Sequence, residues 1–328
     1  MTVTAYYSSD THAPSVGIAA QAFFTTILTA CLVNGYTGKS AAGWTSAYTG
    51  STGQVAYQQG AGSNGFFLNV DDSAASANGS NARVQMFETM SAFGTGTNGT
   101  PTTAQISGGG YFPRGNNGTD TLPGRWLVIA DAKRFYMWHE GTSTSGTTGF
   151  GVVVGFGDID TFGASDIYAT LLMAYSGSGP SGAGGMQHGG TTMVSLSSGN
   201  YMMRRFDQLS TGCQITKSWD YVKGGQTAYM GNSTAATALA YPNPVDGGIY
   251  VSPVWVSEAI VSANPVLRGV VPGIWAPLHY LVGTPASVLA LDTVTGSGLT
   301  AGKTFTFCNC QANGNAGWVC FETSNTWS

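Results

Sequence analysis

Four apolar runs follow one another in the middle of the chain, and the connections between them are too short to hold a helix. The runs occupy residues 125–131, 134–138, 150–156 and 167–175. Their β-branched, aromatic and aliphatic residues favour strands, and only Ala132 and Lys133 separate the first two runs, which predicts a tight turn. Because a parallel pair of strands needs a crossover of roughly a dozen residues or more, we predict an antiparallel meander that forms the core.

One helix is predicted, over residues 15–34. Ser15 stands where a helix N-cap belongs, and Gly35 stands where a C-terminal glycine belongs. Apolar side chains recur between them at helical spacing, at Phe23, Ile27 and Ala30 and at Phe24, Leu28 and Cys31. We expect this helix to cover a face of the sheet.

Part of the predicted helix, residues 16–33, carries no charge and is just long enough to be considered as a membrane span. Gln21 and three threonines interrupt this stretch, and Lys39 is the only basic residue near it. Membrane helices usually have a clearer charged flank. We therefore expect a packed helix and no membrane contact.

Short β-like runs punctuated by Gly, Asn and Pro make up most of the remaining sequence. They lie at residues 54–58, 65–71, 83–90, 214–221, 249–256, 266–271, 303–310 and 318–322. Seven prolines between Pro242 and Pro285 predict that the later strands are short, edge-placed or interrupted. The fold class predicted is mainly β, with antiparallel sheets in a sandwich or meander, one covering N-terminal helix and many Gly-rich loops.

A second Gly-rich stretch, residues 176–190, ends the predicted meander. It suggests a soft boundary between an N-terminal part, residues 1–180, with the helix and the β core, and a second β region, residues 181–328. A single domain is the alternative, since 328 residues are compatible with either.

The composition is low in charge and rich in glycine. Charged residues make up 9% of the chain, against about 25% in ordinary soluble domains, and 48 of the 328 residues are Gly. Much of the exterior must therefore be neutral, which favours association with other proteins. We expect the Gly-, Ser-, Thr- and Asn-rich segments 92–118 and 176–190 to form contact surfaces. The net charge of −4 offers no basic footprint, so nucleic acid is not an expected partner.

Motifs of cofactor binding and catalysis are incomplete. Residues 177–182 match G-x-G-x-x-G, but Pro180 and further glycines stand where a helix should open. Two Gly-Lys-Ser/Thr triplets lack the earlier glycine of a phosphate-binding loop. No G-x-S-x-G elbow occurs, and His139-Glu140 lacks the second histidine of a zinc protease. We predict no catalytic residue and no cofactor.

Carboxylates offer the one chemical alternative, because glycoside hydrolysis needs two facing acids. The candidates are Asp71, Asp72, Glu88, Asp158, Asp160 and Glu258. Asp158 and Asp160 are the strongest pair, because alternate residues of a strand point the same way. Such a pair in a Gly-rich β protein more often caps a strand or binds an ion.

Most aromatic residues and the cysteines are predicted to lie in the core. Most of the eight tryptophans lie inside apolar runs. Tyr111 and Phe112, near the Gly-rich loops, are predicted to be exposed and to contact a partner. The five cysteines are too dispersed for a disulfide framework, so buried thiols are expected and no metal is predicted. They are Cys31, Cys213, Cys308, Cys310 and Cys320, with His279 the histidine nearest the last three.

A series of short motifs resembles a family of virion structural proteins of tailed bacteriophages. The motifs run in order through nearly the whole chain. They are Tyr6-Tyr7-Ser8-Ser9-Asp10-Thr11 with Pro14, Leu32-Val33-Asn34-Gly35-Tyr36, Ala41-Ala42-Gly43-Trp44, Gly65-Phe66-Phe67-Leu68-Asn69-Val70-Asp71-Asp72, Glu88-Thr89-Met90, residues 126–131, Gly273-Ile274-Trp275-Ala276-Pro277-Leu278-His279 and Glu322-Thr323-Ser324-Asn325-Thr326-Trp327.

The resemblance implies a particle component and carries no enzymatic residues. The expected function is a non-enzymatic structural component of the virion, on the tail or baseplate, with a capsid decoration or neck protein as the alternative. Its partners would be other virion proteins and copies of itself. A protein that binds or cleaves carbohydrate, with a host surface glycan as partner, is the alternative of another class. Since the start of the chain lacks the basic residues of a secretory signal, assembly in the host cytoplasm is expected.

Overall fold

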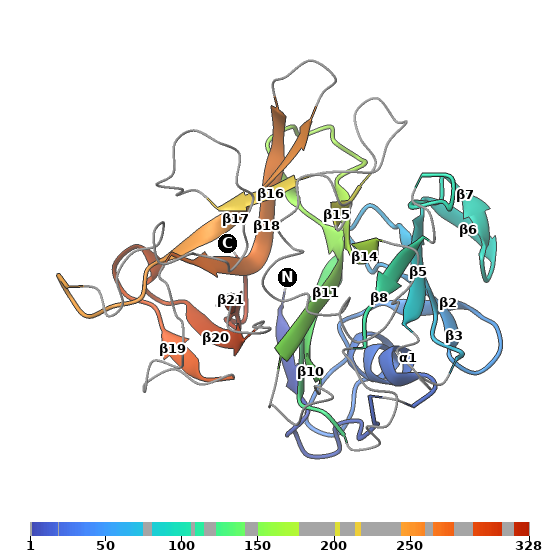
Figure 1. Cartoon of the computed structure of the whole chain (residues 1–328), viewed down its shortest axis with the longest axis horizontal. Coiled ribbons are helices and arrows are strands. Elements are labelled where there is room, and N and C mark those ends of the chain that lie inside the picture. The colour runs from blue at the N-terminus through green and yellow to red at the C-terminus, as the bar shows by residue number, and fades with distance from the viewer. Residues whose placement is uncertain are drawn as a thin grey trace.

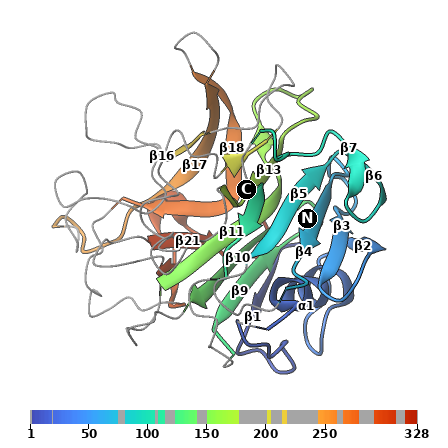
Figure 2. The same ribbon diagram turned by 45° about the vertical axis from the view of Figure 1, so that its right-hand side comes forward.

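The computed structural model describes residues 2–18, 20–74, 81–105, 109–114, 123–141, 150–176, 201–203, 214–217, 244–259, 265–278, 291–309 and 318–327. Three large antiparallel sheets lie in layers, with one short helix against two of them (Figures 1 and 2). This confirms the predicted fold class. The boundary predicted near residue 180 falls at residues 177–200, outside the described part of the chain.

The central sheet contains the predicted meander, and all its strand pairs are antiparallel. Its order is β1 (Thr4–Tyr7), β9 (Trp126–Ala130), β10 (Arg134–Gly141), β11 (Phe150–Asp158), β13 (Thr170–Met173) and β15 (Tyr201–Met202). Strands β9, β10, β11 and β13 are neighbours in this sheet in that order, which confirms the prediction. Strand β1, from the start of the chain, adds to the edge at β9.

The N-terminal sheet covers one face of the central sheet. Its order is β14 (Tyr175–Ser176), β8 (Gly110–Phe112), β5 (Ala82–Phe87), β4 (Phe67–Asp71), β3 (Gln54–Gln58) and β2 (Thr45–Thr49). A separate hairpin joins β6 (Thr89–Ala92) to β7 (Thr95–Thr97). This hairpin overlaps the start of the Gly-, Ser-, Thr- and Asn-rich segment 92–118.

The C-terminal sheet covers the opposite face. Its order is β16 (Gln214–Lys217), β17 (Val251–Ala259), β18 (Pro265–Pro277), β21 (Trp318–Glu322), β20 (Thr304–Asn309) and β19 (Thr293–Thr295), and β12 (Asp160–Thr161) also pairs with β18. The prolines predicted strands that are short, edge-placed or interrupted. Strands β17 and β18 are long, but they are interrupted, because the register between them shifts between Pro253 and Val254.

The alternation of side chains along β9 explains its unbroken apolar sequence. Trp126, Val128 and Ala130 belong to the core shared with the N-terminal sheet, whereas Leu127 and Ile129 belong to the core shared with the C-terminal sheet. All five residues are buried. A strand covered on both faces has no solvent-facing position for a polar residue.

Polar groups anchor both ends of β9. At its start, the Trp126 N–H donates to Ser8 Oγ at 3.1 Å. At its end, Asp131 Oδ1 accepts from the N–H groups of Lys133 and Arg134 at 2.7 and 2.9 Å. The tight turn to β10 is therefore held by the aspartate that precedes it.

The helix is shorter than predicted. Helix α1 (Phe23–Leu28) continues as a π-helical segment, η1 (Thr29–Asn34), and Gly35 ends it with a positive φ of 69°, as expected. The predicted start at Ser15 is wrong, because the helix begins after Ala22, whose φ is 64°. The helix is capped by Asp72, the residue that follows β4. Its carboxylate accepts the Phe24 N–H at 2.6 Å.

Side chains of α1 pack into the core between the central and N-terminal sheets. Phe23, Phe24, Ile27 and Leu28 have no exposed surface, which confirms the predicted packing on the sheet. Within the described ranges, this helical segment is too short to cross a bilayer, and no other helix there is long and apolar enough.

Candidate binding site

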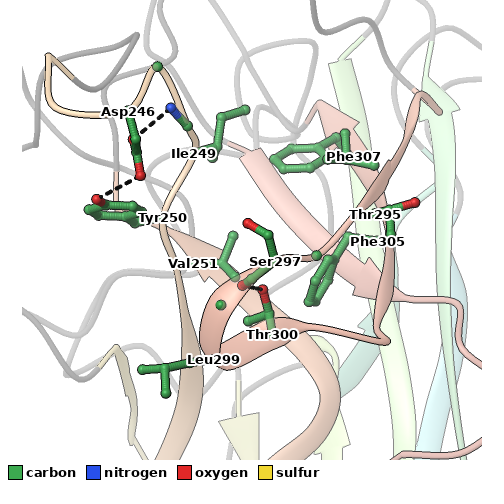
Figure 3. A pocket seen from close by; sticks show the side chains of 15 residues that line it. Asp246, Ile249, Tyr250, Val251, Thr295, Ser297, Leu299, Thr300, Phe305 and Phe307 are labelled. Carbon is green, nitrogen blue, oxygen red and sulfur yellow. Dashed lines mark hydrogen bonds between the residues drawn. The ribbon is translucent and has the colours of Figure 1, made fainter.

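A cavity of about 650 Å³ lies on the outer face of the C-terminal sheet (Figure 3). Along β20, Cys308 faces the central sheet, while Phe305 and Phe307 point to the other side and line the cavity. Residues 246–251, which lead into β17, form one wall. Residues 294–300, which include the end of β19 and the turn after it, form the other. Strands β18, β21 and β20 lie between β17 and β19 in the sheet, so the two segments face each other across the cavity, over the outer face of the sheet.

The first wall is organised around Asp246. Its Oδ1 accepts the Gly248 N–H at 2.9 Å, and its Oδ2 accepts the Tyr250 hydroxyl at 3.1 Å. The hydrogen bond to Asp246 raises the pKa of Tyr250. The carboxylate is thereby held in one orientation at the rim.

The second wall is a tight turn with a single-turn 3₁₀ helix, η2 (Gly298–Thr300). The Thr300 N–H and hydroxyl both donate to the Ser297 carbonyl, at 3.1 and 2.9 Å. Leu299 projects fully into solvent. In Figure 3 the Ser297 hydroxyl points across the cavity towards the wall formed by Ile249 and Val251.

Charge beside the cavity is paired within the sheet. Lys303 Nζ lies 2.9 Å from Glu322 Oε1, and Trp275 Nε1 donates to Glu322 Oε2 at 2.9 Å. The Trp275 ring packs edge-on against Phe305, with centroids 5.6 Å apart. Among the described residues that line the cavity, Asp246 is the one acidic residue, and none is basic.

Tyr111 and Phe112 are not the exposed aromatics that the sequence predicted. They lie in β8, where Tyr111 is 7% exposed and Phe112 is fully buried. Phe112 packs against Phe24 and Phe135. The expectation of exposure was wrong because the flanking glycines suggested a loop, whereas Gly110 is itself part of the strand. Contact of these residues with a partner stays a prediction.

Asp158 and Asp160, the best candidate pair for glycoside hydrolysis, lie in different surroundings. Asp158 ends β11 and is 7% exposed. It accepts hydrogen bonds from Gln59 Nε2, the Asn64 N–H and Thr170 Oγ1, each at 2.8 Å. Asp160 lies in β12 of the next sheet and accepts from Arg134 Nη1 at 3.0 Å. The chain passes from one sheet to the other between them, which strand periodicity could not indicate.

The other predicted acids serve local structure where their side chains are described. Asp71 accepts from Gln54 Nε2 and Ser73 Oγ, and Glu88 accepts from Asn98 Nδ2. Asp72 forms a buried ion pair with Arg114 in addition to capping α1. The side chain of Glu258 lies outside the described part of the chain.

His139 is a core residue. Its Nε2–H donates to the Pro113 carbonyl at 2.8 Å, and the rings of Phe23 and Phe24 meet it edge-on, each at 5.4 Å. Burial lowers the pKa of His139 to about 4, in spite of the hydrogen bonds to Pro113 and Glu140, which favour the charged form; the nearby Arg114 contributes in the same direction as burial. At neutral pH the imidazole is therefore uncharged.

The described cysteines, Cys31, Cys308 and Cys320, are buried, as expected, and form no disulfide with one another. Cys308 faces the core shared with the central sheet, whereas Cys320 lies on the outer face of the same hairpin. The two cannot share one metal ion. Cys213, Cys310 and His279 lie outside the described residues, and within those residues no group of three metal-ligating side chains occurs.

No protein-family model matches the chain, and no curated protein matches its sequence. The cavity therefore has to be interpreted from its own residues. The turn signal Asp246-Gly247-Gly248 before a strand was visible in the sequence. Its proximity to residues 294–300 around one cavity is seen only in the folded structure.

Proposed function

We propose that the chain is a non-enzymatic structural component of a tailed-bacteriophage virion, carried on the tail or baseplate. A capsid decoration or neck protein is the alternative within the same class. The observation that supports the proposal best is that most of the few basic side chains in the described part of the chain are paired with carboxylates of the same chain, which leaves few unpaired cations on that part of the exterior.

Most basic side chains in the described part of the chain are committed to internal ion pairs. Eight Lys and Arg side chains are described there, and six of them pair with a carboxylate. The six are Lys39, Arg114, Arg125, Arg134, Arg268 and Lys303.

Three of these cations are buried inside the protein. The side chains of Arg114, Arg134 and Arg268 are at most 6% exposed. They contribute little to the charge that a neighbouring molecule meets. The centres of protein interfaces are depleted in charged residues, and surfaces of low charge associate readily. The exterior is thus suited to permanent contact with other copies and other virion proteins.

The location of the chain in purified particles tests this proposal. Gold-labelled antibody against the chain should decorate intact virions and isolated tails at one fixed position in electron micrographs. Label on the tail or baseplate supports the first assignment, and label on the head or neck supports the alternative. A chain that is absent from purified virions and stable as a free monomer would refute both.

Carbohydrate binding is the second candidate function, and the cavity on the C-terminal sheet favours it. A host surface glycan would then be a partner. The Asp158 and Asp160 pair, which suggested this class, is a weaker basis because the hydrogen bonds of Asp158 are already made within the fold.

A further inference from the structure

We propose that the cavity between residues 246–251 and 294–300 binds a short neutral saccharide, with Tyr250 as its packing surface and Asp246 as its principal hydrogen-bond acceptor. The inference does not rest on the virion role. It follows from the size of the cavity, its mixed lining and its lack of cationic groups.

The size and lining fit a small ligand that is partly apolar. Binding cavities for small molecules usually measure about 300–1,000 Å³ and combine apolar walls with a few placed polar groups. This one measures about 650 Å³. Phe305 and Phe307, at 3% and 2% exposure, form a fixed aromatic floor, while Tyr250 is 40% exposed at the edge. Sugar rings present C–H faces that pack on such aromatic surfaces.

The polar groups fit hydroxyl groups. Each oxygen of the Asp246 carboxylate accepts one internal hydrogen bond, from Gly248 or Tyr250. A carboxylate oxygen has a second lone pair, so both oxygens can also accept from adjacent sugar hydroxyls. The Ser297 hydroxyl, which points across the cavity, can donate or accept.

The electrostatics argue against anionic ligands. Phosphate and carboxylate groups are usually bound by Arg, Lys or backbone N–H groups at a helix start. No described lining residue is basic, and Asp246 would repel an anion. Cleavage is also not expected here, because glycoside hydrolysis uses two carboxylates and Asp246 is the one acid among the described lining residues.

Binding is measured on the full chain by isothermal titration calorimetry and by saturation-transfer difference NMR. The probes are glucose, galactose, N-acetylglucosamine, maltose, lactose and chitobiose, with N-acetylneuraminic acid as the anionic comparison. We expect at least one neutral sugar to bind at one site per chain and N-acetylneuraminic acid to bind more weakly than that sugar.

Variants locate the site. Tyr250→Ala and Asp246→Asn should each weaken binding about tenfold, which is the effect of losing about 1.4 kcal/mol of contact. Phe162→Ala is the matched control, because Phe162 is a 59% exposed aromatic residue that stacks on Trp255 and does not line the cavity. Its affinity should stay within about twofold of wild type. Tyr250 and Asp246 are exposed, and a urea unfolding curve for each variant checks that the fold is intact.

Three results would overturn the proposal. The first is the absence of binding by every neutral probe. The second is unchanged affinity in both Tyr250→Ala and Asp246→Asn. The third is loss of binding in Asp160→Asn alone, which would assign the sugar to the region of Asp158 and Asp160. None of these results bears on where the chain lies in a virion.

Discussion

Protonation of His139 should destabilise the fold as the pH falls from 7 to 4. An unfolded histidine has a pKa of about 6.5, whereas in the fold it is about 4, because the ring is buried among Phe23, Phe24 and Pro113. Between these two values the unfolded chain binds more protons than the native one, so stability decreases on acidification. The loss amounts to about 2 kcal/mol at pH 5 and about 3 kcal/mol at pH 4.

Asp72 opposes this effect in nearly the same pH range. Burial raises its pKa to about 6, against the lowering influence of Arg114 and of the Phe24 N–H. Here the native state binds more protons than the unfolded one, which adds about 1.5 kcal/mol of stability at pH 5. The wild-type protein should therefore show only a shallow change between pH 7 and pH 5.

A variant separates the two groups. In His139→Gln the amide can still donate to the Pro113 carbonyl but cannot take up a proton. Urea unfolding of wild type and variant at pH 7, 6 and 5 gives the difference in their free energies of unfolding. That difference should move by about 2 kcal/mol in favour of the variant between pH 7 and pH 5. His12→Gln, which replaces an exposed histidine, is the control. A difference that stays constant with pH would show that burial does not hold His139 neutral.

Three further predictions concern packing, assembly and chemistry. Leu28→Asp should lower the free energy of unfolding by about 3 kcal/mol or more, because it places a charge in the core without a partner. Thr26→Asp, on the exposed side of α1, should change it by less than about 0.5 kcal/mol. Equal effects of the two variants in urea unfolding would contradict the packing of α1. Backbone hydrogen exchange of residues 92–105 should be slower in virions than in the free chain, while β9 exchanges slowly in both, and unchanged exchange of residues 92–105 would show that the contacts lie elsewhere. The purified chain should not hydrolyse host polysaccharide, and turnover that disappears in Asp160→Asn, whose side chain is 61% exposed, would refute that expectation.

The meander could be predicted from the sequence because it depends on neighbours in the chain. Each strand from β9 to β13 follows the previous one after a short connection. The start of α1 could not be predicted in this way, because its capping carboxylate is Asp72, forty-eight residues after Phe24. A local N-cap rule selects Ser15, and no local rule can see a cap supplied by another strand.

The candidate cavity escaped sequence analysis for a similar reason. Asp246 and Tyr250 form a local pair, whereas Ser297 and Phe305 belong to a part of the sheet that β18 and β21 separate from β17. The four residues line one cavity only because the segments before β17 and after β19 meet over the outer face of the sheet. The prediction that Tyr111 and Phe112 are exposed was wrong for the same kind of reason. Their glycine neighbours predicted exposure, and the pairing of β8 with β5 placed them inside the sheet.

The double-sided burial of β9 has a consequence for how the chain finds its correct pairing. When one face of a strand is polar, a slip by one residue exposes apolar groups and is strongly disfavoured. In β9 a slip would exchange one apolar set for another, so hydrophobicity alone discriminates poorly between alignments. The correct register must then be selected by polar groups whose hydrogen bonds form in one register only. These are Ser8 at one end of β9 and Asp131 at the other. Two polar residues outside the strand thus fix its register.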